Sequence, residues 1–164
     1  MEIISFLSMH LKNLAREKEE YGGIIKLEDK AVKEVRIIKG TKDMVRRSFE
    51  TPEMGRKMYE DGWVTFHSHP KDGKPSFVDE FLSHLVGPCF VLTPSGIWRL
   101  RPAIILPFEK FKALYEKNWK RAQQEFPRLP EDIKNLGTVN DLWIVFCLMD
   151  LPLVRRKFFP LSEG

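Results

Sequence analysis

Runs rich in β-branched and aromatic residues alternate with helix-like stretches through the first hundred residues, and this order limits the fold more than any other feature. The first stretch repeats apolar residues at spacings of three and four, which is typical of an amphipathic helix. Turns containing Gly, Pro, Asp and Ser separate the strand-like runs. We predict helices at 3–18, 52–60 and 76–86, and strands at 21–27, 31–38, 45–49, 63–67, 89–92 and 97–100. This order predicts an α/β (α+β) domain in which helices flank a mixed sheet.

The character of the sequence changes after Pro102. Residues 108–126 form a predicted helix rich in Lys and Glu. The apolar segment 139–151 fits either a buried helix or a strand, because periodicity does not separate the two. We therefore divide the chain into a core, 1–106, and a mostly helical C-terminal appendage, 107–164. The appendage is expected to pack on the core or to mediate association, for example as a homodimer.

The composition excludes several classes of protein. The longest apolar stretch, 142–154, is too short for a membrane span, which needs about 20 residues. Cys89 and Cys147 form neither a disulfide framework nor a metal knuckle, which favours a reducing, cytoplasmic location. The net charge of +4 comes without blocks of like charge, so no nucleic-acid partner is expected. The abundance of charged residues beside few Asn and Gln is typical of a heat-stable protein.

Two histidines and an aspartate near the predicted strand 63–67 could hold a metal ion. His67 and His69 stand two residues apart at the strand end, so both side chains project to one face. Asp79 lies in the first turn of the next helix, where it can point back to the strand end. Three protein ligands and one open position for water are the pattern of catalytic zinc. Ser76-x-x-Asp79 also has the spacing of a helix capping box, which needs no metal.

These segments resemble a known signature. His67-Ser68-His69-Pro70, followed by Ser76-Phe77-Val78-Asp79, resembles the motif of the JAMM metalloproteases, the catalytic branch of the MPN domain family. Glu20-Tyr21-Gly22-Gly23, followed by aliphatic residues, is similar to the upstream Glu-x-x-Gly of that family. The resemblance covers about residues 3–105 and implies an MPN-like sheet in a minimal, prokaryotic-type member. The loop before Asp79 is one residue shorter than the commonest spacing in the family.

The resemblance also implies roles for the residues. His67, His69 and Asp79 would bind one Zn²⁺ per chain, and Glu20 would transfer protons as general base and acid. Ser76 would contact the developing oxyanion. Glu19 is the alternative base, since Glu19 also stands three residues before a glycine.

The family suggests an enzyme, and three functions remain open at this point. The first is a zinc metallo-isopeptidase or peptidase that removes a ubiquitin-like or sulfur-carrier-like small modifier protein from its conjugate. The second is a catalytically inactive MPN-type scaffold that binds partners. The third is a zinc hydrolase of a non-protein amide. Neither nucleic acid nor a membrane is expected as a partner.

Overall fold

A computed structural model of the chain describes residues 1–40, 51–71, 73–135 and 140–161. The chain divides into two compact units. The first combines Met1–Ala103 with Val154–Gly164, and the second is Ile104–Leu153. The predicted strand at 45–49 lies outside the described residues.

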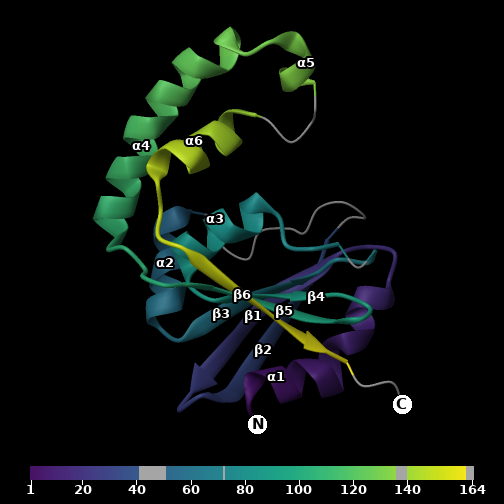
Figure 1. The fold of residues 1–164 in the computed structure, drawn as a ribbon. Coiled ribbons are helices and arrows are strands. Elements are labelled where there is room, and N and C mark those ends of the chain that lie inside the picture. The colour runs from purple at the N-terminus through teal and green to yellow at the C-terminus, as the bar shows by residue number, and fades with distance from the viewer. Residues whose placement is uncertain (41–50, 72, 136–139, 162–164) are drawn as a thin grey trace. The chain divides into compact units, whose positions relative to one another are not determined.

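The first unit contains one six-stranded sheet with the order β2-β1-β3-β4-β5-β6 (Figure 1). Neighbouring strands are antiparallel, except that β3 and β4 run parallel. The sheet is therefore mixed, and helices flank it, as the order of sequence patterns predicts. The strands are β1 (Tyr21–Glu28), β2 (Ala31–Lys39), β3 (Trp63–Ser68), β4 (Cys89–Leu92), β5 (Gly96–Pro102) and β6 (Val154–Pro160).

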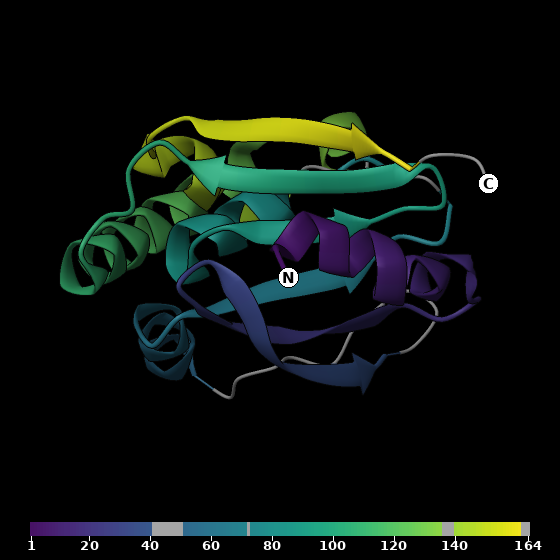
Figure 2. The same cartoon turned by 90° about the horizontal axis from the view of Figure 1, so that it is seen from below.

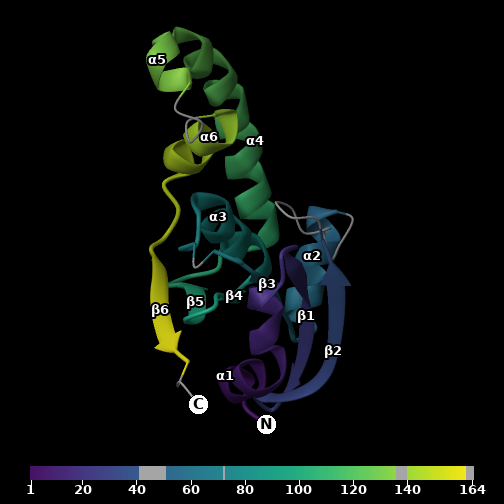
Figure 3. The same ribbon diagram turned by 90° about the vertical axis from the view of Figure 1, so that its right-hand side faces the viewer.

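Helices lie on both faces of this sheet. The N-terminal helical segment covers one face and α3 lies on the other (Figures 2 and 3). The second helix, α2, packs on α3 and β3. The predicted helix at 3–18 is irregular, since a π-helical turn and a 3₁₀ turn follow its first turn. The helical elements are α1 (Ile3–Phe6), η1 (Leu7–Leu11), η2 (Lys12–Arg16), α2 (Pro52–Glu60) and α3 (Phe77–Val86).

The hydrophobic core of this unit lies between the N-terminal helical segment and the sheet. Leu7 and Leu11 pack there against Phe66 of β3 and Phe90 of β4. At the β1–β2 pair, a Cβ added to Gly23 would lie 2.0 Å from the carbonyl oxygen of Arg36. Because no side chain fits in that space, only glycine allows β2 to approach β1 this closely. This approach holds β1 in place beside the strand that carries the two histidines.

The second unit is helical. Its helix α4 packs on α6, and the Gln123 amide donates to a carboxylate oxygen of Asp141 over 3.0 Å. Within the apolar segment 139–151, which periodicity left undecided, Asp141–Met149 form helix α6. Asn140 caps this helix by accepting a hydrogen bond from the Trp143 amide. The elements are α4 (Phe108–Glu125), η3 (Phe126–Arg128), α5 (Glu131–Lys134) and α6 (Asp141–Met149).

The last strand changes the expected division of the chain. The sequence analysis placed 107–164 in a helical appendage, whereas β6 pairs with β5 along its whole length. The chain therefore leaves the first unit at Ala103 and returns to it at Val154. Among the described residues, no helix is both long enough and apolar enough to cross a membrane.

Candidate metal centre

Strand β3 brings His67 and His69 to the same place. His67 belongs to the strand, and the backbone N–H of His69 donates to the Leu92 carbonyl oxygen of β4 over 2.7 Å. This bond continues the strand geometry by one residue, so the two imidazoles project to the same face. Their rings are 4.9 Å apart between centroids, and the two Nε2 atoms are 3.1 Å apart. The spacing of two residues thus places both rings together, as predicted.

Helix α3 supplies the third group, Asp79. Ser76 is the N-cap of this helix, and the Asp79 amide donates to its Oγ over 3.4 Å. In return, the Ser76 amide donates to Asp79 Oδ2 over 2.7 Å. This reciprocal capping box fixes the first turn of α3. Asp79 Oδ1 then lies 3.0 Å from His67 Nε2, and Oδ2 lies 3.9 Å from His69 Nε2.

The three side chains fit a metal ion. Each offers one ligand atom, and these atoms lie within 4.8 Å of one another. In a tetrahedral zinc site with bonds of about 2.0–2.1 Å, neighbouring ligand atoms stand about 3.3 Å apart. His67 Nε2 lies near that distance from Asp79 Oδ1, at 3.0 Å, and from His69 Nε2, at 3.1 Å. Between Asp79 and His69 the separation is 3.9 Å and involves the other carboxylate oxygen, Oδ2. This is the only group of three or more His, Cys, Asp or Glu side chains, within the part of the chain that the structure describes, that could hold a metal.

A loop carbonyl orients His69. Its Nδ1 lies 2.9 Å from the carbonyl oxygen of Gly73. Because a carbonyl oxygen only accepts, Nδ1 carries the hydrogen, so in the neutral form of the ring the lone pair lies on Nε2. Nε2 is the atom that faces His67 and Asp79. Such an outer hydrogen bond from the second ring nitrogen is usual for metal-binding histidines.

The electrostatics favour an ionised Asp79. Burial raises the pKa of this carboxyl, but the hydrogen bond and charge of His67, the Ser76 amide and the charge of His69 outweigh it. The net result is a pKa below the usual value of an aspartic acid. Asp79 is 7% exposed, whereas the side chains of His67 and His69 are 16% and 19% exposed. The group therefore contains a ready anionic ligand and stays accessible from solvent on the histidine side.

Glu20 lies directly before β1. In the β1–β3 pair Gly22 stands opposite His67, and the Tyr21 amide donates to Ser68 Oγ over 2.8 Å. Continuing this register by two residues puts Glu20 opposite His69. Since opposite residues of an antiparallel pair share a face, Glu20 belongs to the face of the two imidazoles. Glu19, one residue earlier, lies in the bend that precedes β1.

Some contacts of the site were not predicted from the sequence. The Ser68 hydroxyl, fully buried, links β1 to the His-x-His segment, and the Gly73 carbonyl orients His69. A serine between two histidines is a weak signal in the sequence, and a backbone carbonyl gives no signal.

Cys89 is also buried beside Asp79. Burial, and next the charge of Asp79, raise the pKa of its thiol, so Cys89 stays a neutral packing residue.

The chain was compared with protein-family models, curated proteins and solved structures, and none of the three comparisons finds a match. The assignment of a function therefore depends on the site itself.

Proposed function

We propose that the protein is a zinc-dependent metallo-isopeptidase or peptidase that resembles the JAMM metalloproteases. It would hydrolyse an amide or isopeptide bond and release a ubiquitin-like or sulfur-carrier-like small modifier. The observation that supports this most is the convergence of His67, His69 and Asp79, from a strand end and a helix start, on one point. Two imidazoles and one carboxylate form a donor set that catalytic zinc uses.

The metal fits the site for three reasons. The donor set contains nitrogen and oxygen only, and its atoms lie within 4.8 Å of one another. Three protein ligands would leave room for a water molecule as the fourth. Zinc held by these residues would act as a Lewis acid toward a carbonyl group and would activate water near neutral pH.

The chain supplies the proton transfer. Glu20 would take a proton from the attacking water and return it to the leaving amine. Extending the β1–β3 register by two residues beyond the Gly22–His67 pair supports Glu20, since it would then stand opposite His69. Glu19, in the bend before β1, is the alternative base.

Ser76 is proposed to stabilise the oxyanion. Its hydroxyl oxygen accepts the hydrogen bond of the Asp79 amide, which leaves the hydroxyl hydrogen available for donation. The side chain is exposed beside the buried Asp79, so a substrate carbonyl could reach it. A hydroxyl aimed at a developing oxyanion lowers the activation free energy by about 3–4 kcal/mol where water is excluded.

A scaffold is the second candidate, and one observation favours it. The capping box and the contact between His67 and Asp79 give these side chains structural partners without any metal. A protein that kept them for stability alone would bind partners and hydrolyse nothing. The measurement of bound metal separates this candidate from the enzyme.

The first experiment is elemental analysis of the purified protein after exposure to zinc and desalting. We expect about one zinc per chain in the wild type and none in the His67→Ala/His69→Ala variant. His10→Ala, which removes an exposed histidine from the N-terminal helical segment, is the matched control and keeps the metal. Equal metal in all three proteins, or no metal in the wild type, would leave the scaffold as the better function.

The second experiment tests the reaction. A ubiquitin-like protein joined to a lysine side chain is incubated with zinc-loaded protein, and release is followed by electrophoresis. Cleavage by the wild type that Glu20→Gln abolishes and Glu19→Gln preserves supports the proposal. A zinc-loaded protein that hydrolyses small amides but no such conjugate would point to a non-protein substrate.

A further inference from the structure

Four basic side chains share one face of β5 and β6. Arg99 stands directly opposite Lys157, and Arg101 stands directly opposite Arg155. Opposite residues of an antiparallel pair lie on the same face, as do residues two apart along a strand. These four residues, Arg99, Arg101, Arg155 and Lys157, are called the cationic face below. The cationic face thus consists of two neighbouring cross-strand pairs, each made of two positive charges.

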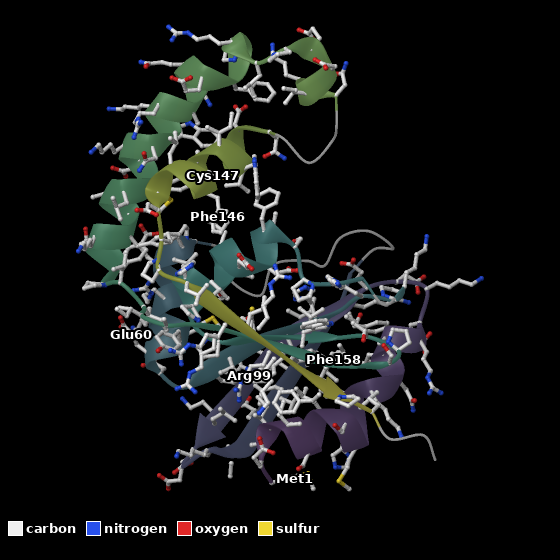
Figure 4. The ribbon with its side chains drawn as sticks, viewed as in Figure 1. Met1, Glu60, Arg99, Phe146, Cys147 and Phe158 are labelled. Atoms are coloured by element: carbon white, nitrogen blue, oxygen red, sulfur yellow. The ribbon has the colours of Figure 1, made fainter. Side chains whose placement is uncertain are left out.

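The cationic face lies on the side of the sheet away from the candidate metal centre. Arg156, between the two pairs, forms an ion pair over 2.6 Å with Glu80 of α3, so it faces α3. The neighbours of Arg156 along β6 therefore face the other way. There Phe90, opposite Arg99, packs into the core under α1. Figure 4 shows Arg99 on the side of the sheet where α1 lies.

These four charges have no acidic partner within the described residues. No carboxylate there forms an ion pair with any of the four, whereas Lys33, Arg36 and Arg156 each have one. Arg99 and Lys157 instead lie over the ring of Phe159, at 5.5 and 5.0 Å from its centroid. Like charges directly opposite each other destabilise a sheet. Paired cations that oppose folding and lack a counter-charge among the described residues are suited to binding an anion of another molecule.

The geometry specifies the kind of anion. β6 is an edge strand, and among the described residues no strand pairs with its outer side. Positions two apart on a strand are separated by about 6.8 Å. An extended segment laid beside β6 with Asp or Glu at every second position would therefore set its carboxylates against Arg155 and Lys157. Arginine also forms paired hydrogen bonds with carboxylates.

We propose that β6 and the cationic face form a docking surface for an extended, acidic segment of a partner protein, which binds by adding a strand to the sheet. This mode of binding combines backbone hydrogen bonds with pairing of alternate side chains. It does not depend on the proposed hydrolase activity, because the surface and the metal centre use different residues on opposite faces.

A single-stranded nucleic acid fits less well. Proteins that bind such strands offer aromatic rings on which the bases stack. On the cationic face the aromatic residue is Phe159, which is half-buried against the core and has two cations over its ring. The more exposed ring, Phe158, belongs to the other face, 4.9 Å from Trp98. No base-stacking platform accompanies the charges on this face, within the described residues.

The test measures peptide binding by fluorescence anisotropy with the full-length protein. The probe is a labelled peptide of about ten residues, roughly twice a typical strand, in which Glu and Thr alternate. A peptide with the same composition, but with its Glu residues grouped in adjacent pairs, presents carboxylates on both faces and is the control. The alternating peptide should bind more tightly, and Arg155→Gln/Lys157→Gln should weaken it at least about tenfold.

The matched variant is Lys33→Gln/Arg36→Gln, which removes two cations from β2, the other edge of the sheet. It should bind the alternating peptide like the wild type. Equal binding of the two peptides, or equal losses in the two double variants, would mean nonspecific charge attraction and would overturn the proposal. Tighter binding of an oligothymidylate of equal charge through Arg155 and Lys157 would overturn it in favour of nucleic acid. Thermal unfolding of each variant verifies that it is folded.

Discussion

The ring of His69 donates its Nδ1 hydrogen to the carbonyl oxygen of Gly73, 2.9 Å away. This one bond assigns the lone pair of the neutral imidazole to Nε2, the atom that faces His67 and Asp79. The loop between β3 and α3 therefore does more than connect them, because it orients a candidate metal ligand.

The first prediction concerns this loop. Deleting Gly73 should lower the affinity for zinc about 10–100-fold, as the loss of such an outer contact usually does. Gly73→Ala should change little, since an added Cβ would lie 3.5 Å from His69 Nδ1, an ordinary contact. Competition with a zinc-chelating dye gives both affinities. Equal affinities in the two variants would show that the carbonyl does not matter to the metal.

The second prediction separates the two roles of Ser76. Ser76→Ala removes the cap of α3 and should cost about 1 kcal/mol in the free energy of unfolding, whereas Ser76→Gly should cost a few tenths. Both variants lack the hydroxyl, so both should lose hydrolytic activity by about 10²–10³-fold. Urea unfolding of the metal-free proteins and cleavage rates of the zinc-loaded ones provide the comparison. Retained activity in Ser76→Gly would exclude the oxyanion role.

The third prediction concerns the general base. Glu20→Gln should lower the cleavage rate about 10²–10⁴-fold without changing the zinc content. Glu19→Gln should leave the rate near that of the wild type, because Glu19 lies in the bend before β1 and is not the residue that the extended register sets opposite His69. If Glu19→Gln is the slow variant instead, the strand register does not continue to Glu20 as inferred.

The fourth prediction uses a histidine outside the site. His84 of α3 is 2% exposed, and neither of its ring nitrogens has a hydrogen-bond partner among the residues that the structure describes. Burial lowers its pKa, so the folded protein holds it neutral while the unfolded chain binds a proton below about 6.5. Above the unfolded-state pKa of about 6.5, the histidine is neutral in both states and does not reduce the free energy of unfolding. As the pH falls below that value, the unfolded chain takes up the proton first, and the free energy of unfolding decreases.

His84→Leu should remove this dependence. The free energy of unfolding of the wild type should fall relative to the variant as the pH is lowered below about 6.5. Urea unfolding with a chelator present, at several pH values, gives the difference between the two proteins. Parallel pH curves would mean that His84 has the same pKa in both states.

Much of the fold and of the site follows from local sequence signals. The pair of strands β1 and β2 is one example, since both were predicted and Asp29 and Lys30 form the turn between them with positive φ values. The spacing of His67 and His69 is another, because strand periodicity brings both to one face. Such features depend on residues that are close together in the sequence, so they can be predicted from the sequence alone.

Other features depend on distant partners. Strand β6 lacks the apolar alternation of a half-buried strand, since most of its residues are exposed at a sheet edge. Its pairing with β5 is therefore seen only in the structure. For this reason the predicted appendage, 107–164, wrongly included the residues of β6. Helix α6 has apolar residues on all sides, so its sequence lacks the 3.6-residue periodicity that would identify it as a helix. The π-helical turn at Leu7–Leu11 has no local signature either.

The last prediction tests whether the like-charge pairs of β5 and β6 oppose folding. Arg155→Glu turns the contact with Arg101 into an opposite-charge pair and should raise the free energy of unfolding by about 0.2–1 kcal/mol. Arg155→Gln, which removes the repulsion without adding an attraction, should give a smaller gain. Added salt should reduce both gains, because it screens exposed charges. Urea unfolding at low and high salt measures them. A loss of stability in Arg155→Glu would show that an unseen anion or contact compensates Arg155 in the isolated protein.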